Sequence, residues 1–359
     1  MLHWHFADPD GRWAAVRLKQ HAGLAPMRAA LAFERSGDDW VLEVPRPPID
    51  RIEYQLELHG YDGSVQTVPD PANPRQAPGV FGRPSVLELP GYRPPWWLDA
   101  EAGEWTRTWF TVVGRGLRDV PVELCSPAWA RPTDTLPLLV AHDGGELDTL
   151  ARLTDYASAT VAAGRVPAYR IALLSPLDRD NWYSGSTAYC RTLATSVLPR
   201  LRREVSVTGP VVGYGASLGA LSMLATQLRH PGTFGGLALA SGSFFHPTDD
   251  PQESGFRRYW RIVDRVTDVL QGAMTVGSTL GSRLGSGSGS VDHGVTWMRV
   301  GMVCGTVEEN LASNTRMAAA LDASGHAVTF APFRDAHNFT AWRDAFDPHL
   351  TSVLADLWG

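Results

Sequence analysis

The sequence predicts an α/β fold in which helices cover a mainly parallel sheet and a small β-sandwich precedes it. In the first ninety or so residues, polar and apolar residues alternate in short runs, as they do in the strands of a sandwich. From about residue 105, apolar strand-like runs alternate with longer segments of helical periodicity, which indicates βαβ units. A chain of 359 residues also has room for one large domain and a smaller module.

The amino-terminal part is predicted to be a β-sandwich of residues 1–95. Segments 40–44 (WVLEV) and 51–58 (RIEYQLEL) alternate in polarity and are separated by turns rich in Gly, Pro and Asp. Segment 69–90 is rich in Pro and Gly, and 91–95 (GYRPP) follows it like a stiff linker. We therefore place the domain boundary near residue 95.

Residues 96–359 are predicted to form the α/β domain. Buried parallel strands are short and almost entirely apolar, whereas helices packed on a sheet carry apolar residues three and four apart. Strands are expected at 136–141, 171–174, 210–213, 237–240, 298–304 and 327–331. Helices are expected at 187–203, 218–229, 309–324 and 339–358.

One stretch, 246–292, interrupts this alternation. It contains a polar loop, a helical segment at 257–270 and the low-complexity run GSTLGSRLGSGSGS. We interpret the stretch as an excursion that covers the active site, and the Gly/Ser run as a flexible loop.

Composition excludes several classes of protein. The formal net charge is -6, from 32 basic and 38 acidic residues without a basic stripe, so nucleic-acid binding is not expected. Cys125, Cys190 and Cys304 show no C-x-x-C spacing, which argues against a disulfide framework and a zinc site and favours a reducing compartment. The start MLHWHFADPDGRW lacks an export signature, and no apolar run approaches membrane-spanning length. We expect a cytoplasmic protein that is not bound to a membrane; the sequence does not indicate its oligomeric state.

The motif that carries chemistry is the single G-x-S-x-G of the chain, at 215–219 (GASLG). It follows the apolar run PVVGY and opens the helix candidate LGALSMLATQLRH, which is the strand, sharp turn and helix of a nucleophile elbow. Small neighbours let a serine occupy such a tight turn. Ser217 is therefore the candidate nucleophile.

A serine hydroxyl needs a base to remove its proton, and in this motif order the histidine comes late in the chain. His337 lies just after the last strand candidate and before the closing helix, where a loop can hold it above the sheet. His326 precedes that strand and His349 lies within the helix, so both are poorer candidates.

The acid that orients the base is expected on the loop after 298–304. Glu308 is our choice, with Glu309 close behind; either could instead be a first-turn acid favoured by the dipole of the next helix. Asp335 is a weaker candidate, because it is only two residues from His337.

Oxyanion stabilisation is expected from backbone N–H groups. The turn after Ser217 directs the N–H of Leu218 towards the developing oxyanion. A second donor is expected in the loop after 136–141, where Gly144 and Gly145 let the backbone approach a substrate. The sequence shows no H-E-x-x-H motif and no paired carboxylates at helical spacing, so no metal and no cofactor are expected.

Several blocks of the sequence resemble the enterochelin esterase-like branch of the esterase D family of α/β-hydrolases. They cover most of the chain and read DPANP, VLELPGY, LLVAHDG, GYGASLGALSMLA, RHPGTFGGLALASGSFF, CGTVEENL and DAHNFTAWRDAF. The resemblance implies an α/β-hydrolase domain preceded by an immunoglobulin-like domain. It also implies that Ser217, Glu308 and His337 are the serine, acid and histidine of the family.

Members of this group act on trilactone siderophores, sugar or aryl esters and acyl-trehalose substrates. The resemblance thus implies a small-molecule ester substrate, with a siderophore trilactone or a related ester as the candidate. Arg179 and Trp342 are candidate substrate-binding residues. Arg257, Arg258 and Arg261 could also face an anionic ligand, or be solvated surface charges.

Three functions fit these residues. The first is a serine carboxylic-ester hydrolase that works through an acyl-enzyme. The second is an acyltransferase that moves the acyl group to a sugar hydroxyl. The third is a non-catalytic binding protein on the same fold.

Overall fold

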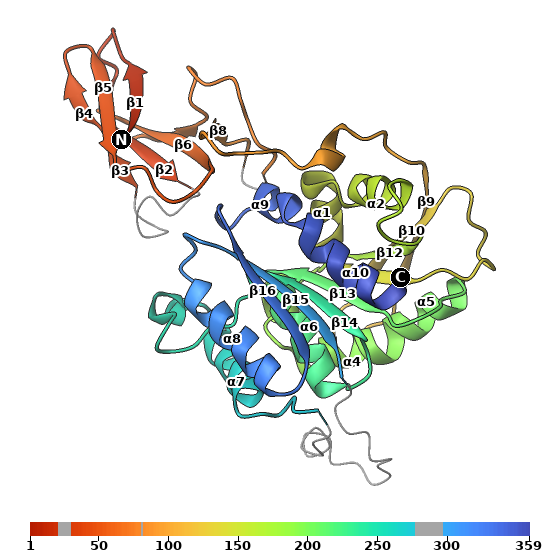
Figure 1. Cartoon of the computed structure of the whole chain (residues 1–359). Helices are drawn as coiled ribbons and strands as arrows, with labels where there is room; N and C mark the ends of the chain where they lie inside the picture. Colours follow the sequence, from red (N-terminus) through yellow and green to blue (C-terminus); the bar gives the residue numbers. More distant parts are fainter. Residues whose placement is uncertain (21–29, 80–81, 277–296) are drawn as a thin grey trace.

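The fold is a mixed α/β layer structure with an amino-terminal β-sandwich, as Figure 1 shows. The computed structural model describes residues 1–20, 30–79, 82–276 and 297–359. The amino-terminal strands form a separate lobe at the upper left of the view, and α9 lies between this lobe and the large sheet. The predicted fold class is confirmed.

The lobe consists of two antiparallel sheets packed face to face. Within its described residues, one sheet has the order β1-β5-β4 and the other the order β3-β2-β6-β7, with β8 also paired to β6. Alternate residues such as Trp4, Leu18 and Leu56 point inward and form the core between the sheets. The strands are β1 (Leu2–Ala7), β2 (Trp13–Gln20), β3 (Leu31–Ala32), β4 (Glu34–Ser36), β5 (Asp39–Val44), β6 (Arg51–Gly60), β7 (Val65–Val68) and β8 (Ser85–Glu88).

The main body is built on one large sheet whose order, over the described residues, is β16-β15-β14-β13-β11-β12-β10-β9. From β16 to β12 all neighbours run parallel, whereas β10 and β9 at one edge are antiparallel. The strands are β9 (Trp105–Val112), β10 (Val120–Pro127), β11 (Leu138–His142), β12 (Arg170–Leu174), β13 (Val212–Ala216), β14 (Gly236–Ala240), β15 (Arg299–Gly305) and β16 (Ala327–Phe333).

Helices cover both faces of this sheet. Successive residues of β11 show why: Leu138 and Val140 join one buried cluster, whereas Leu139 and Ala141 join the other. The first cluster is completed by α4, α6, α7 and α8, and the second by α1, α2 and α10. The helices are α1 (Gly144–Ala151), α2 (Leu153–Ala162), α3 (Arg179–Tyr183), α4 (Thr187–Thr192), α5 (Leu198–Glu204), α6 (Leu218–Arg229), α7 (Tyr259–Leu270), α8 (Leu311–Ala323), α9 (Phe339–Asp344) and α10 (Thr351–Trp358), with the shorter turns η1 (Trp96–Asp99), η2 (Leu193–Val197), η3 (Pro251–Gly255) and η5 (Phe346–Leu350).

The predicted boundary near residue 95 falls between β8 and β9, in a stretch where the one regular element is η1. The division into 1–95 and 96–359 stays a prediction. Of the predicted excursion, residues 246–276 carry η3 and α7, whereas the Gly/Ser run lies outside the described residues. Helix α7 packs on α8.

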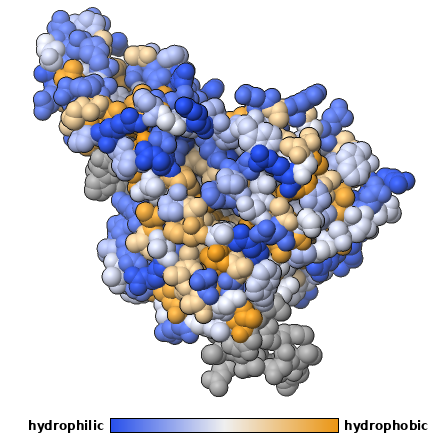
Figure 2. Space-filling view, in the orientation of Figure 1, coloured by the Kyte–Doolittle hydropathy of each residue, from blue (hydrophilic) through white to orange (hydrophobic). Residues whose placement is uncertain are grey.

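Three further findings concern the surface, the thiols and the helices. Figure 2 shows that hydrophilic residues cover most of the amino-terminal lobe, while hydrophobic residues gather on the main body beneath it. The three cysteines are free and buried, and burial raises the pKa of the Cys125 thiol to about 12. In the part of the chain that the structure describes, no helix is both long and apolar enough to cross a bilayer.

Candidate active site

Ser217 occupies a strained turn between β13 and α6. Its backbone has φ 56° and ψ -125°, a conformation that residues with a side chain rarely adopt. Hydrogen bonds hold the turn, because the Ser217 N–H donates to Ala240 O at 2.9 Å and its carbonyl accepts from the Ser243 N–H at 3.1 Å. The turn thus presents the hydroxyl at the amino-terminal end of α6, as a nucleophile elbow does.

Small residues make this turn sterically possible. A Cβ on Gly215 would lie 2.4 Å from the carbonyl carbon of Gly219, which is far inside contact distance. Buried His142 also contacts the turn, since its Nδ1 lies 3.0 Å from Gly219 O. Burial lowers the pKa of His142 to about 4, so its ring is neutral at physiological pH.

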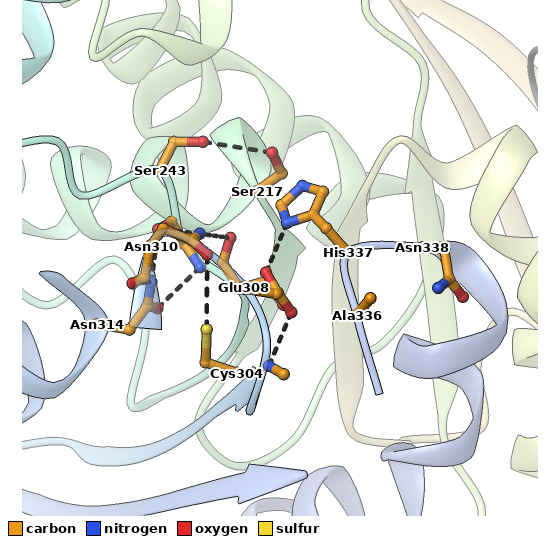
Figure 3. A network of polar contacts seen from close by, with 12 residues as sticks. Ser217, Ser243, Cys304, Glu308, Asn310, Asn314, Ala336, His337 and Asn338 are labelled. Carbon is orange, nitrogen blue, oxygen red and sulfur yellow. Dashed lines mark hydrogen bonds and ion pairs between the residues drawn. The ribbon is translucent and has the colours of Figure 1, made fainter. Parts of the chain in front are cut away.

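His337 lies on the loop between β16 and α9, and Glu308 lies on the loop between β15 and α8. Their side chains meet: Nδ1 of His337 is 2.7 Å from Oε2 of Glu308. Figure 3 shows the imidazole between Ser217 and Glu308. The three predicted residues therefore come together from three loops at the carboxyl ends of parallel strands.

The Glu308 carboxylate is held from its other side. Its Oε1 accepts from Ser241 Oγ and from the backbone N–H of Gly305, both at 2.7 Å. The Trp342 indole donates in turn to Ser241 Oγ at 3.0 Å. The Trp342 ring also meets the imidazole edge to face, with centroids 5.0 Å apart. Because the Glu308 side chain is 1% exposed, this chain of contacts fixes it with little help from water.

Neither alternative acid and neither alternative base takes part in the contact between His337 and Glu308. Asp335 points to the amino-terminal lobe, where it pairs with Arg51 at 2.9 Å. The Nε2 of His326 is 2.8 Å from Met274 O, and burial lowers the pKa values of both His326 and His349. Glu309 is half-buried, and the carboxylate bonded to His337 is that of Glu308.

A pocket of about 310 Å³ opens over Ser217 and His337 and takes its walls from both the amino-terminal lobe and the main body. Ser217 and His337 share it with residues of the amino-terminal lobe, and no described residue of 246–276 lines it. The described part of the predicted excursion, residues 246–276, therefore does not cover the pocket. The remaining lining residues are Glu53, Pro78, Gly79, Gly82, Pro84, Asp143, Glu146, Arg179, Asn338, Phe339 and Trp342.

The predicted oxyanion donors lie at two helix starts. Leu218 is the first residue of α6, and Gly144 and Gly145 begin α1 after the single linking residue Asp143, where a longer loop was expected. Gly144 packs so tightly on β12 that a Cβ there would lie 2.4 Å from Cβ of Leu173. The first N–H groups of a helix lack intrahelical partners, so both helix starts can offer donors.

Both predicted substrate-binding residues line the pocket. Arg179 makes a bidentate ion pair with Asp143, with both N to O distances at 2.8 Å. Its charge is thus largely offset before any ligand arrives. Arg261 instead bonds to Asn181 and Ser184, and Arg257, Arg258 and Arg261 are not among the described lining residues.

Sequence reasoning missed four residues that shape the site. Ser243 lies with its Oγ 3.3 Å from Ser217 Oγ, and Ser241 holds Glu308. Both belong to the block ASGSFF, whose polar residues after an apolar strand were a usable signal. Glu53 and Arg51 come from the lobe and gave no local signal. The described residues contain no group of His, Cys, Asp and Glu that could hold a metal ion.

Comparison with known proteins finds that the model of the Esterase family matches residues 117–353. This span includes Ser217, Glu308 and His337 and excludes the sandwich. A search of curated proteins finds no match.

Among solved structures, the ferric enterobactin esterase of Salmonella typhimurium is similar with a TM-score of 0.73 at 18% identity, over 98% of this chain and 92% of that chain. The enterobactin esterase of Shigella flexneri, solved in the presence of enterobactin, has a TM-score of 0.72 at 19% identity, over 99% of this chain and 92% of that chain. A ferulic acid esterase has a TM-score of 0.55 at 16% identity, over 72% of this chain and 100% of that chain. These matches show a shared fold.

Proposed function

This chain belongs to the Esterase family and is an ester hydrolase, and we propose that it works through an acyl-enzyme formed on Ser217. The observation that carries the proposal is that His337, which contacts Glu308 through Nδ1, lines the same pocket as Ser217. Because Nδ1 of His337 faces Glu308, Nε2 is the nitrogen left for the serine hydroxyl. Glu308 then fixes the tautomer and stabilises the imidazolium.

The reaction proceeds in two steps. Ser217 Oγ attacks the ester carbonyl carbon while its proton passes to Nε2 of His337. The tetrahedral oxyanion collapses, the carbon–oxygen bond to the leaving alcohol breaks, and that alcohol takes the proton. Water then attacks the acyl-enzyme, with His337 again as the base, and releases the acid and the free serine.

The oxyanion is proposed to bind to backbone N–H groups of Leu218 and of Gly144 or Gly145. Both sets stand at helix starts, where unpaired N–H groups and the helix dipole favour negative charge. Asp143 and Glu146, which flank Gly144 and Gly145 in the sequence, both line the pocket. This supports Gly144 or Gly145 as the second oxyanion donor.

A labelling experiment tests the nucleophile. A fluorophosphonate probe is expected to modify Ser217 of the native protein, as mapped by peptide mass spectrometry, and Ser217→Ala is expected to lose both label and ester hydrolysis. Ser222→Ala is the matched control, since the hydroxyl of this buried serine of α6 makes no hydrogen bond with any described residue. A folded native protein that resists the probe, or a Ser217→Ala variant with native activity, would contradict the mechanism.

For the substrate, we propose a siderophore trilactone or a related ester. The alignment with enterobactin esterases includes the sandwich, which contributes pocket walls here. Pro78, Pro84, Phe339 and Trp342 give the pocket apolar and aromatic walls suited to an aryl group.

The charges of the pocket refine this proposal. Glu53, Asp143 and Glu146 line it, and Arg179 is the one cation among the described lining residues and already pairs with Asp143. This balance favours an ester of low negative charge over a highly anionic ferric complex. Comparing kcat/KM for the iron-free trilactone, the ferric trilactone, feruloyl esters and acyl-sugar esters decides among these substrate classes.

A cytoplasmic location is proposed from the sequence.

A further inference from the structure

The loop that carries His337 is tied to the amino-terminal lobe through one buried guanidinium. Arg51, at the start of β6, has a side chain that is 2% exposed. Its Nε donates to Asp335 Oδ2 at 3.0 Å, and its Nη2 donates to Asn338 Oδ1 at 2.7 Å. Its Nη1 donates to Glu53 Oε1 at 2.6 Å. One rigid planar group thus contacts residues on both sides of His337.

Packing holds the same loop. Ala336, immediately before His337, is 3% exposed and belongs to the hydrophobic core of the lobe. Val307, next to Glu308, packs against that core as well. The lobe therefore contacts the neighbours of both members of the His337–Glu308 pair.

The side chains that accept hydrogen bonds from Arg51 in this loop are also hydrogen-bonded to the backbone. The second oxygen of Asp335 accepts from the Ala336 N–H at 2.7 Å. Asn338 Oδ1 also accepts from the Ala341 N–H at 2.8 Å and so caps α9. A shift of Arg51 would consequently move the backbone of residues 335–338 rather than a side chain alone.

We propose that Arg51 is a positioning residue of the esterase reaction, which sets the orientation of the His337 imidazole from the amino-terminal lobe. Arg51 does not line the pocket over Ser217, so it acts through Asp335 and Asn338. Loosening these contacts lets the imidazole leave its alignment with Ser217, which lowers kcat much more than it raises KM. This inference rests on the proposed role of His337 as the base.

The choice of variant matters, because removing Arg51 alone leaves two buried carboxylates without their cation. The double variant Arg51→Met/Asp335→Asn removes one positive and one negative charge, so the net charge of the Arg51, Glu53 and Asp335 cluster is unchanged. Met and Asn also nearly keep the volumes of the side chains that they replace. Arg51→Lys is the conservative variant, since an ammonium keeps the charge but cannot span Asp335 and Asn338 as the guanidinium fork does.

Arg334→Ala is the matched control. Arg334 precedes Asp335 in the same loop and also pairs with the lobe, through Asp50 at 3.0 Å, but its side chain is 52% exposed. An exposed ion pair of this kind contributes little.

The measurements are kcat and KM for p-nitrophenyl acetate and the rate of Ser217 phosphonylation, on variants whose cooperative thermal unfolding shows that they are folded. The double variant is expected to lose about 10²-fold in kcat and in phosphonylation rate, with KM within about threefold of native. The kcat and phosphonylation rate of Arg51→Lys are expected to lie between those of the double variant and those of the native protein. Both values for Arg334→Ala are expected to stay within about twofold of native.

A folded double variant with native kcat would overturn the inference, as would a loss confined to KM. If the double variant does not fold, the kcat of Arg51→Lys is the test instead. A native kcat in a folded Arg51→Lys variant would also overturn the inference. Failure of the proposed function is distinguishable, because then the native protein itself would not be phosphonylated at Ser217.

Discussion

At the scale of single residues, Glu308 uses both carboxylate oxygens, one for His337 and one for Ser241 and the Gly305 N–H. Glu308→Ala is expected to lower kcat for a short aryl ester by about 10²- to 10⁴-fold, because the imidazole loses its orienting partner. Steady-state kinetics check this. Glu309→Ala is measured beside it, and a larger loss in that variant than in Glu308→Ala would assign the acid to Glu309.

The same scale shows what local sequence can and cannot predict about the site. The proximity of Ser217, His337 and Glu308 is predictable because each follows a recognisable strand within a few residues, and the parallel order of these strands brings them to the carboxyl end of the sheet. Their catalytic roles stay a proposal. The contact of Arg51 with the His337 loop is not predictable, because its partner Asp335 is 284 residues away in the chain. No periodicity or motif relates two residues across that separation.

At the scale of elements, the turn between β13 and α6 depends on a backbone approach that only glycine permits. Gly215→Ala is expected to lower the free energy of unfolding by about 1–3 kcal/mol, because the new methyl group overlaps the Gly219 backbone. Denaturant unfolding measures this. Gly255→Ala is the control, since a Cβ there meets no atom within 4 Å, and it should change stability by less than about 0.5 kcal/mol. Equal stability of the two variants would contradict the steric argument.

The elements that sequence predicted well are those with a strong pattern. The expected strands reappear as β11 to β16 with ends shifted by a few residues, and α6 occupies the expected 218–229. The edge strands β9 and β10 were not predicted, and β9 (WTRTWFTV) is largely solvent-exposed, with Trp109 at 67%. Helix α1 was missed because it opens with two glycines and lacks a clear apolar repeat.

At the scale of the whole molecule, the junction between lobe and main body contains a carboxyl group that titrates unusually. Burial raises the pKa of Asp335 from 3.8 to about 6, although Arg51 opposes the shift; the nearby Glu53 and Asp344 add to it. The folded protein therefore holds this proton more tightly than the unfolded chain does. The stability that results is present below about pH 4 and is lost as pH rises through about 6.

This gives a pH prediction that a single variant isolates. Between pH 4 and 7, the free energy of unfolding of the native protein minus that of Asp335→Asn is expected to fall by up to about 3 kcal/mol, because Asn cannot titrate. Urea unfolding at several pH values measures the difference. A difference that stays constant, or that grows as pH rises, would contradict the assigned direction.

The pocket is walled by Glu53, Pro78 and Pro84 on one side and by the main body on the other. Anyone who exchanges residues 1–95 for the corresponding module of another esterase, in order to graft its selectivity, also replaces the guanidinium at position 51. Such a chimera would then combine altered recognition with a disturbed base, and a poor turnover would be misread as poor recognition. Domain exchange therefore reports on selectivity only where the new module keeps arginine at that position and also keeps the apolar residues that pack on Ala336 and Val307.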